Sequence, residues 1–235
     1  MDLYGKTRVY DDLSEPDHKL KFRELSVIAD FFGGIFSRNY FKASAKTNPK
    51  DILILPGFGT NTRYMFLLKY ELESLGHNVE DWGVGFNHGD VPVLAEQFAE
   101  VIQKRFQESQ KKITLVGWSL GGYIARETAR DFPEIVEKVI TMGTPVIGGP
   151  RYTAAAKFYE RKGESLDEIE KATIERFEKP LEVPIVAFYA KTDGVVSWQA
   201  CIDHWSKDVE HIEVQSSHLG MGFSREILDI LPYKL

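Results

Sequence analysis

The 235-residue sequence has a single cysteine, Cys201, so no disulfide bond can form within the chain. One cysteine is typical of proteins kept in a reducing compartment, and we interpret Cys201 as a buried helix residue. No apolar run approaches the roughly 18 residues that a membrane-spanning helix needs. The first 19 residues also lack the apolar core of a secretory signal. These absences predict a soluble, cytoplasmic protein without stable membrane insertion.

The chain also lacks an excess of basic residues. It has 29 Lys and Arg against 35 Asp and Glu, a formal net charge of −6. Proteins that bind nucleic acid usually present a basic face, so nucleic acid is not an expected partner. The sequence contains no motif with metal-ligand spacing and no nucleotide-binding motif, so neither a metal nor a cofactor is expected. The oligomeric state is left open.

From residue 51 onward, short apolar runs alternate with amphipathic segments. Helical patterns lie between the runs at residues 62–76, 91–109 and 120–132. Unbroken apolar strands that alternate with helices form parallel sheets covered on both faces. We therefore predict an α/β fold with a mainly parallel sheet of about six strands. The predicted strands lie at residues 51–55, 77–86, 111–118, 136–143, 183–191 and 209–215.

Residues 1–50 precede this alternation and predict a helical and loop extension packed on the domain of residues 51–235. The apolar side chains of residues 20–36 recur at a helical period, which predicts one helix with an apolar face. That face consists of Phe22, Leu25, Ala29, Phe32 and Phe36.

Residues 146–182 form an insertion between the fourth and fifth predicted strands. They hold two helical patterns, and Ser165 with Glu168 has the spacing of a capping box for the second. Seven basic and seven acidic residues lie between residues 151 and 179, so the charges of this segment balance. We predict a small helical cap on the domain.

The segment GWSLG at residues 117–121 fits the pattern G-x-S-x-G, and it lies between a predicted strand and a predicted helix. In that context the glycines permit a sharp turn that holds the serine hydroxyl clear of the sheet. The turn also places Ser119 at a helix N-terminus, where a developing negative charge is stabilised. The pattern therefore predicts that Ser119 is presented as a nucleophile.

A serine nucleophile needs a base within hydrogen-bond reach and an acid that orients the base. His218 follows the last predicted strand, and Asp193 follows the fifth. Both are thus expected at the carboxyl ends of the strands, where ligands bind in such sheets. His211 lies within a strand pattern and is interpreted as structural, whereas His88 is expected to line a pocket.

The motifs LPGFG, GWSLGG, KTDGVV and SSHLGMG occur in an order and spacing that resemble the α/β-hydrolase superfamily, in particular its lipase and carboxylesterase-like serine hydrolases. The resemblance covers about residues 51–235. It implies Ser119 as nucleophile, Asp193 as orienting acid and His218 as base.

The resemblance also implies an oxyanion hole formed by the backbone N–H groups of Phe58 and Leu120. Pro56-Gly57 stands where many family members have a His-Gly pair, which removes the contacts of that histidine but keeps the backbone donor. Residues 1–50 do not predict the antiparallel strands that often begin this fold, so the expected sheet is a reduced one.

By this resemblance, the expected activity is hydrolysis of small-molecule carboxylic esters through an acyl-enzyme on Ser119. Because the cap is short and its charges balance, short to medium acyl chains are the expected substrates. An acyltransferase or thioesterase with the same triad, or a lipase with a mobile lid, remains an alternative. A non-catalytic module is disfavoured because all three triad residues are present. The candidate pocket residues are Trp118, Tyr64, His88, Trp198, Phe158 and Phe177.

Overall fold

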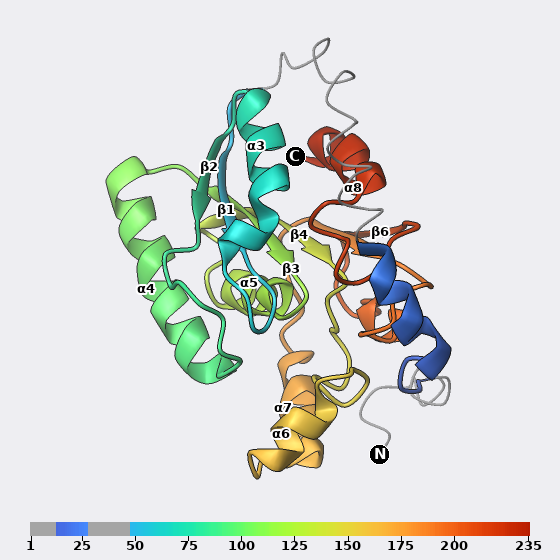
Figure 1. Ribbon diagram of the computed structural model, residues 1–235. Coiled ribbons are helices and arrows are strands. Elements are labelled where there is room, and N and C mark those ends of the chain that lie inside the picture. Colours follow the sequence, from blue (N-terminus) through green and yellow to red (C-terminus); the bar gives the residue numbers. More distant parts are fainter. Residues whose placement is uncertain (1–12, 28–47) are drawn as a thin grey trace.

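The computed structural model describes residues 13–27 and 48–235 of the chain (Figure 1). Six strands form one sheet in the order β2-β1-β3-β4-β5-β6, and every neighbouring pair is parallel. The predicted six-stranded α/β sheet is therefore confirmed. The strands are β1 (Asp51–Leu55), β2 (Asn78–Asp81), β3 (Ile113–Trp118), β4 (Val136–Met142), β5 (Ile185–Tyr189) and β6 (Val209–Glu213).

Helices cover both faces of this sheet, with α3 and α8 on one side and α4 and α5 on the other (Figure 1). Among the described residues, the α-helical elements are α3 (Phe66–Ser74), α4 (Val91–Ser109), α5 (Leu120–Asp131), α6 (Ala156–Arg161), α7 (Leu166–Arg176) and α8 (Arg225–Ile230). The 3-10 helices are η1 (His18–Ser26), η3 (Thr62–Met65), η4 (Trp198–Cys201) and η5 (Leu231–Lys234).

Two apolar cores lie on the two faces because successive side chains of a strand point in opposite directions. In β1, Ile52 and Ile54 pack into the core under α3 and α8. Leu53 and Leu55 pack into the core under α4 and α5. Strands buried on both faces read as unbroken apolar runs, which is why the sequence located them.

The long helix α4 has the bounds predicted from its pattern. Asp90 caps its N-terminus by accepting a hydrogen bond from the Val93 N–H at 3.4 Å. Leu94, Phe98 and Ile102 recur every four residues, and all three are fully buried. The apolar stripe thus fixes both the length and the buried face of this helix.

Three segments differ from the prediction. Residues 62–65 form the 3-10 helix η3 before α3 begins, and β2 ends at Asp81. Gly83 and Gly85 adopt positive φ after β2, so the chain leaves the sheet earlier than the apolar pattern suggested. Helices α8 and η5 at residues 225–234 were not predicted, because six and four residues are too short for a clear periodicity.

For residues 20–26, the predicted N-terminal α-helix is wrong in type, and the two residues of its apolar face that the structure describes are not buried. Residues 18–26 form the 3-10 helix η1 instead of an α-helix. Phe22 and Leu25 were expected to face the domain, but they are 78% and 72% exposed. The other three residues of that apolar face lie outside the described residues.

The insertion forms a pair of short helices, α6 and α7, beyond the carboxyl ends of the strands (Figure 1). As expected, Ser165 caps α7 by accepting a hydrogen bond from the Glu168 N–H at 3.3 Å. Within residues 13–27 and 48–235, no helix combines the length and apolar character needed to cross a bilayer.

Candidate active site

Ser119 sits on a strained turn between β3 and α5. Its φ of 53° lies in the left-handed region, which costs a non-glycine residue about 1–3 kcal/mol. A Cβ on Gly121 would overlap the carbonyls of Leu55 and Pro56, and one on Gly117 would overlap the backbone of α5. The packing that forces glycine at both positions therefore holds the serine in place. This matches the turn predicted from G-x-S-x-G.

His218 and Asp193 form a buried pair at the ends of β6 and β5. Asp193 Oδ2 lies 2.7 Å from His218 Nδ1, and both side chains are almost inaccessible to solvent. The other carboxylate oxygen, Oδ1, accepts hydrogen bonds from the backbone N–H groups of Val195 and Val196 at 2.8 and 2.7 Å. These two donors fix the rotamer of the carboxylate, so it presents one oxygen to the imidazole.

The pKa of His218 lies above its ordinary value of 6.5. Burial by itself lowers this pKa, because it disfavours the charged imidazolium. The negative charge and hydrogen bond of Asp193, assisted by the charge of Glu24, outweigh burial and give the net increase. The site thus stabilises a protonated His218.

Ser119 and His218 line one cavity of about 890 Å³. This volume lies near the upper end of the range of roughly 300–1,000 Å³ that small-molecule sites usually have. Trp118 forms part of its wall and donates a hydrogen bond from Nε1 to the His218 carbonyl at 3.1 Å. Ser119 and His218 therefore border the same cavity.

Phe58 and Leu120 also line this cavity. Leu120 is the first residue of α5, so its N–H has no carbonyl partner within the helix. Among the described residues, no hydrogen bond uses the N–H of Phe58. Asn87 braces the loop that carries Phe58, because its Nδ2 donates to the Pro56 carbonyl at 2.8 Å. Phe58 and Leu120, two residues that line the cavity together with Ser119, thus have backbone N–H groups without an intrahelical or described partner.

The charged side chains of the cavity wall do not balance. Five carboxylates and one guanidinium line it: Asp90, Glu127, Asp131, Glu164, Glu175 and Arg176. The expectation of balanced charge came from residues 151–179 alone. Three of the five carboxylates lie outside that segment, so carboxylates outnumber basic side chains on the wall; two of them, Glu127 and Asp131, are paired with Arg176.

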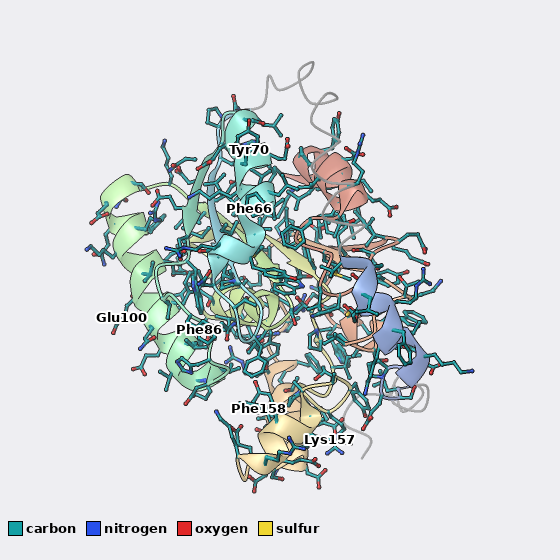
Figure 2. All side chains as sticks on the ribbon, in the orientation of Figure 1. Phe66, Tyr70, Phe86, Glu100, Lys157 and Phe158 are labelled. Atoms are coloured by element: carbon teal, nitrogen blue, oxygen red, sulfur yellow. The ribbon has the colours of Figure 1, made fainter. Side chains whose placement is uncertain are left out.

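Of the six candidate pocket residues, Trp118 lines the cavity. Tyr64 lies behind it, with its ring stacked on the Trp118 indole at 4.8 Å between centroids. Phe158 lies on α6 (Figure 2) and is 37% exposed. Its ring packs against that of Phe58. Tyr64 and Phe158 thus do not line the cavity themselves but pack against two residues that do, Trp118 and Phe58.

The other three candidates lie outside the cavity wall. Phe177 is buried and stacks on Trp205 at 3.8 Å. Trp198 stacks on Tyr189 at 5.8 Å, and His88 is exposed next to residues 89 and 90 of the wall. A sequence pattern places an aromatic residue near a motif but does not say which way its ring points.

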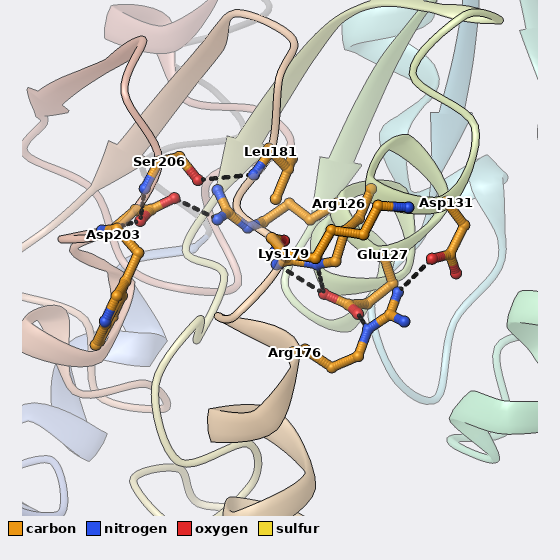
Figure 3. Close-up of polar contacts among 10 residues, drawn as sticks. Arg126, Glu127, Asp131, Arg176, Lys179, Leu181, Asp203 and Ser206 are labelled. Carbon is orange, nitrogen blue, oxygen red and sulfur yellow. Dashed lines mark hydrogen bonds and ion pairs between the residues drawn. The ribbon is translucent and has the colours of Figure 1, made fainter. Parts of the chain in front are cut away.

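His211, Asp203 and Cys201 make structural contacts outside the cavity wall. His211 accepts a hydrogen bond from the Asp203 N–H at 3.0 Å through Nε2. Asp203 forms a buried ion pair with Arg126 of α5 (Figure 3). Cys201 is buried at the end of η4, and burial raises the pKa of its thiol well above the ordinary value. None of these three side chains lines the cavity.

Helix α7 is anchored to the domain at its C-terminal end. Arg176 forms ion pairs with Glu127 and Asp131 of α5, the second at 2.8 Å (Figure 3). Phe177, the next residue, is held by its stack on Trp205. Opening of this end of the cap would have to break both contacts.

Within the described part of the chain, no group of three or more His, Cys, Asp or Glu side chains is arranged to hold a metal ion. The sequence missed two residues that brace the site, Glu24 and Asn87. No sequence pattern marks either residue, because each acts through hydrogen bonds to loops that are distant in the sequence.

A protein family described as alpha/beta hydrolase fold matches residues 52–163. Two curated relatives are the pimeloyl-[acyl-carrier protein] methyl ester esterases of Edwardsiella ictaluri and Vibrio vulnificus. The first is 28% identical over 138 residues, covering 54% of this chain and 50% of the relative. The second is 28% identical over 136 residues, covering 54% and 51%. The chain therefore spans about half the length of the curated relatives it matches.

Solved structures of this fold superpose on most of the chain. A lipase-esterase related protein from Clostridium acetobutylicum has a TM-score of 0.60 at 16% identity, covering 82% of this chain and 96% of its own. Naproxen esterase from Bacillus subtilis has a TM-score of 0.58 at 10% identity, covering 82% and 86%. At these identities the likeness shows the fold alone, and it confirms the fold predicted from the motifs.

Proposed function

We propose that this chain, which has the α/β-hydrolase fold, is a serine esterase acting through an acyl-enzyme on Ser119. The observation that carries the proposal is the buried Asp193–His218 pair at the same cavity as the strained Ser119 turn. A base, an acid that orients it and a fixed hydroxyl are the groups that this chemistry requires.

In the proposed reaction, Ser119 Oγ attacks the ester carbonyl carbon while His218 Nε2 takes the hydroxyl proton. The Asp193 carboxylate accepts the hydrogen bond from Nδ1–H and stabilises the imidazolium. The backbone N–H groups of Phe58 and Leu120 would stabilise the oxyanion, a contribution of about a hundred- to a thousandfold in rate for one such donor. The alcohol leaves with the proton from His218, and a water molecule activated by His218 then releases the acid.

We further propose that residues 146–182 act as a cap over the cavity and select uncharged acyl chains. Apolar wall residues from this segment, such as Ile169 and Ala172, would desolvate an acyl chain. The carboxylates of the wall would repel a substrate that carries a carboxylate of its own. The cavity volume favours medium over very short acyl chains.

The curated relatives are named as esterases of a methyl ester, which supports ester cleavage here as well. A thioesterase or an acyltransferase would use the same three side chains. Product analysis in the presence of an added alcohol or thiol separates these activities, because a transferase forms the new ester or thioester. A lipase with a mobile lid is disfavoured by the ion pairs of Arg176 with α5.

With p-nitrophenyl esters, kcat/KM is expected to increase from acetate to hexanoate or octanoate and to fall at palmitate. Each methylene that enters the cavity adds about 0.8 kcal/mol, or about fourfold in kcat/KM, until the cavity is full. Steady-state rates measured for p-nitrophenyl esters of increasing acyl length, and for a parallel series of methyl esters, give this profile.

A matched comparison uses p-nitrophenyl hexanoate and the mono-p-nitrophenyl ester of adipic acid, which differ only in a terminal carboxylate. The acidic wall is expected to lower kcat/KM for the adipate ester at least about tenfold. A maximum at palmitate with a rate jump at an oil–water interface would instead indicate a lipase with a mobile lid.

A further inference from the structure

The carboxylate of Glu24, on η1, binds the two loops that carry His218 and Asp193. Its Oε1 accepts hydrogen bonds from the backbone N–H groups of Gly194 at 2.9 Å and His218 at 3.1 Å. Its Oε2 accepts one from the Leu219 N–H at 2.9 Å. The Glu24 side chain thus links Gly194, the residue after Asp193, to His218.

The backbone of η1 is also in close contact with the acid loop. A Cβ on Gly194 would overlap the carbonyl of Leu20, so this position has no room for a side chain. Figure 1 shows η1, in blue, beside the loops that follow β5 and β6. The polar contacts of Glu24 and this close approach hold η1 in place, while Phe22 and Leu25 stay exposed.

Other hydrogen bonds fix the same loops through their carbonyl groups. Trp118 Nε1 donates to the His218 carbonyl, and the Tyr64 hydroxyl donates to the Leu219 carbonyl at 3.1 Å. Glu24 binds the N–H groups of these same two residues. The peptide group that follows His218 is therefore bound by Trp118 at its carbonyl and by Glu24 at its N–H group.

We propose that Glu24 is a positioning residue. It sets the distance between Asp193 and His218 and thereby how well His218 is placed to take the serine proton. This inference rests on the proposed function, because it assigns a role in that same site. Hydrogen bonds between a charged acceptor and backbone donors are short and strong, so this carboxylate can restrain two loops at once. Misplacement of a catalytic group by about 1 Å can cost a factor of about 10² in rate.

The charge of Glu24 also acts on His218. Among the described residues, two carboxylates face the histidine: Asp193, from the loop after β5, and Glu24, from η1. Behind them lie Cys201 of η4, near Asp193, and Tyr64 of η3, near Glu24. Burial raises the pKa of both groups above their ordinary values, so they stay neutral near pH 7. Loss of the Glu24 charge should therefore lower the pKa of His218.

The Glu24→Gln variant is expected to lower kcat by about tenfold with little change in KM. The amide keeps one acceptor oxygen but turns an N–H group toward a backbone donor, so at least one of the three hydrogen bonds is lost. The midpoint of the pH profile of kcat/KM is expected to move to lower pH, because a negative charge is removed near the imidazole. A purely structural role would not move that midpoint.

Two further variants separate the effect of charge from that of position. Glu24→Asp keeps the charge, but its shorter side chain cannot reach all three backbone N–H groups, so it is expected to lower kcat with little change in the midpoint of the pH profile. Glu15→Gln removes the same charge from an exposed position in the same N-terminal segment and is expected to leave both unchanged. Thermal unfolding of each variant identifies any that fail to fold, and Glu24→Asp then replaces Glu24→Gln for the kcat measurement.

An NMR titration of the His218 imidazole in the wild type and in Glu24→Gln measures the same pKa without any substrate. A lower pKa together with the loss in kcat supports the proposal. Wild-type kcat and an unchanged pKa in Glu24→Gln overturn it. If the wild type hydrolyses no ester, the proposed function fails, and the NMR titration alone decides whether Glu24 acts on His218.

Discussion

Replacement of His218 by alanine is expected to lower kcat by about 10⁵- to 10⁶-fold, because no base then remains to take the proton of Ser119. The wild-type kcat/KM should increase with pH and level off, since only neutral His218 accepts a proton. The pKa of His218 lies above its ordinary value of 6.5, because Asp193 and Glu24 outweigh burial. The midpoint of the profile is therefore expected above pH 6.5.

The matched control for this prediction is His88→Ala. His88 is exposed and does not line the cavity, so most of the activity should remain. Rates with p-nitrophenyl hexanoate from pH 5 to 9, for the wild type and both variants, provide the measurement. A larger loss at His88 than at His218, or a midpoint below pH 6.5, would contradict the assignment of the base.

Replacement of Asp193 by asparagine is expected to lower kcat by about 10⁴-fold with little change in thermal stability. The amide oxygen can still accept hydrogen bonds from the N–H groups of Val195 and Val196. The amide N–H₂ would then face His218 Nδ1, which favours the wrong tautomer and gives no stabilisation to the imidazolium. Steady-state kinetics and the melting temperature of the purified variant test both parts.

Two other aspartates serve as controls. Asp208→Asn makes the same chemical change at an exposed position and should affect neither kcat nor stability. Asp203→Asn removes one partner of the buried ion pair with Arg126, so it should lower the free energy of unfolding by about 3–5 kcal/mol. The folded fraction should keep its kcat. Equal losses of kcat at 193 and 203 would mean that the acid is wrongly assigned.

The sheet and the serine turn could be predicted because each has a local cause. A strand buried on both faces needs an unbroken apolar run, as in residues 52–55 of β1 and in β5. The close approach of α5 to the end of β1 requires glycine at position 121, and the close approach of the end of β3 to the α5 backbone requires glycine at position 117. The order of strands along the chain then placed residues 193 and 218 at the same edge of the sheet.

The acidic wall and the contacts of Glu24 could not be predicted, because they depend on contacts between distant segments. The carboxylates of the wall come from the residue that caps α4, from α5 and from residues 146–182, and no local pattern shows that they meet. Glu24 lies 170 residues from one of its partners and 194 from another. The apolar period of residues 20–36 favoured Phe22 and Leu25 as the contact face, whereas the contact is made by a charged residue.

The central claim is that Ser119 is the nucleophile, and covalent labelling tests it most directly. A fluorophosphonate probe reacts with a serine only when a neighbouring base activates its hydroxyl, so mass spectrometry of the labelled protein identifies that serine. We expect one adduct, on the peptide that contains Ser119, and no adduct in a folded Ser119→Ala variant. An adduct on another serine, or no labelling of the folded wild type, would contradict the claim.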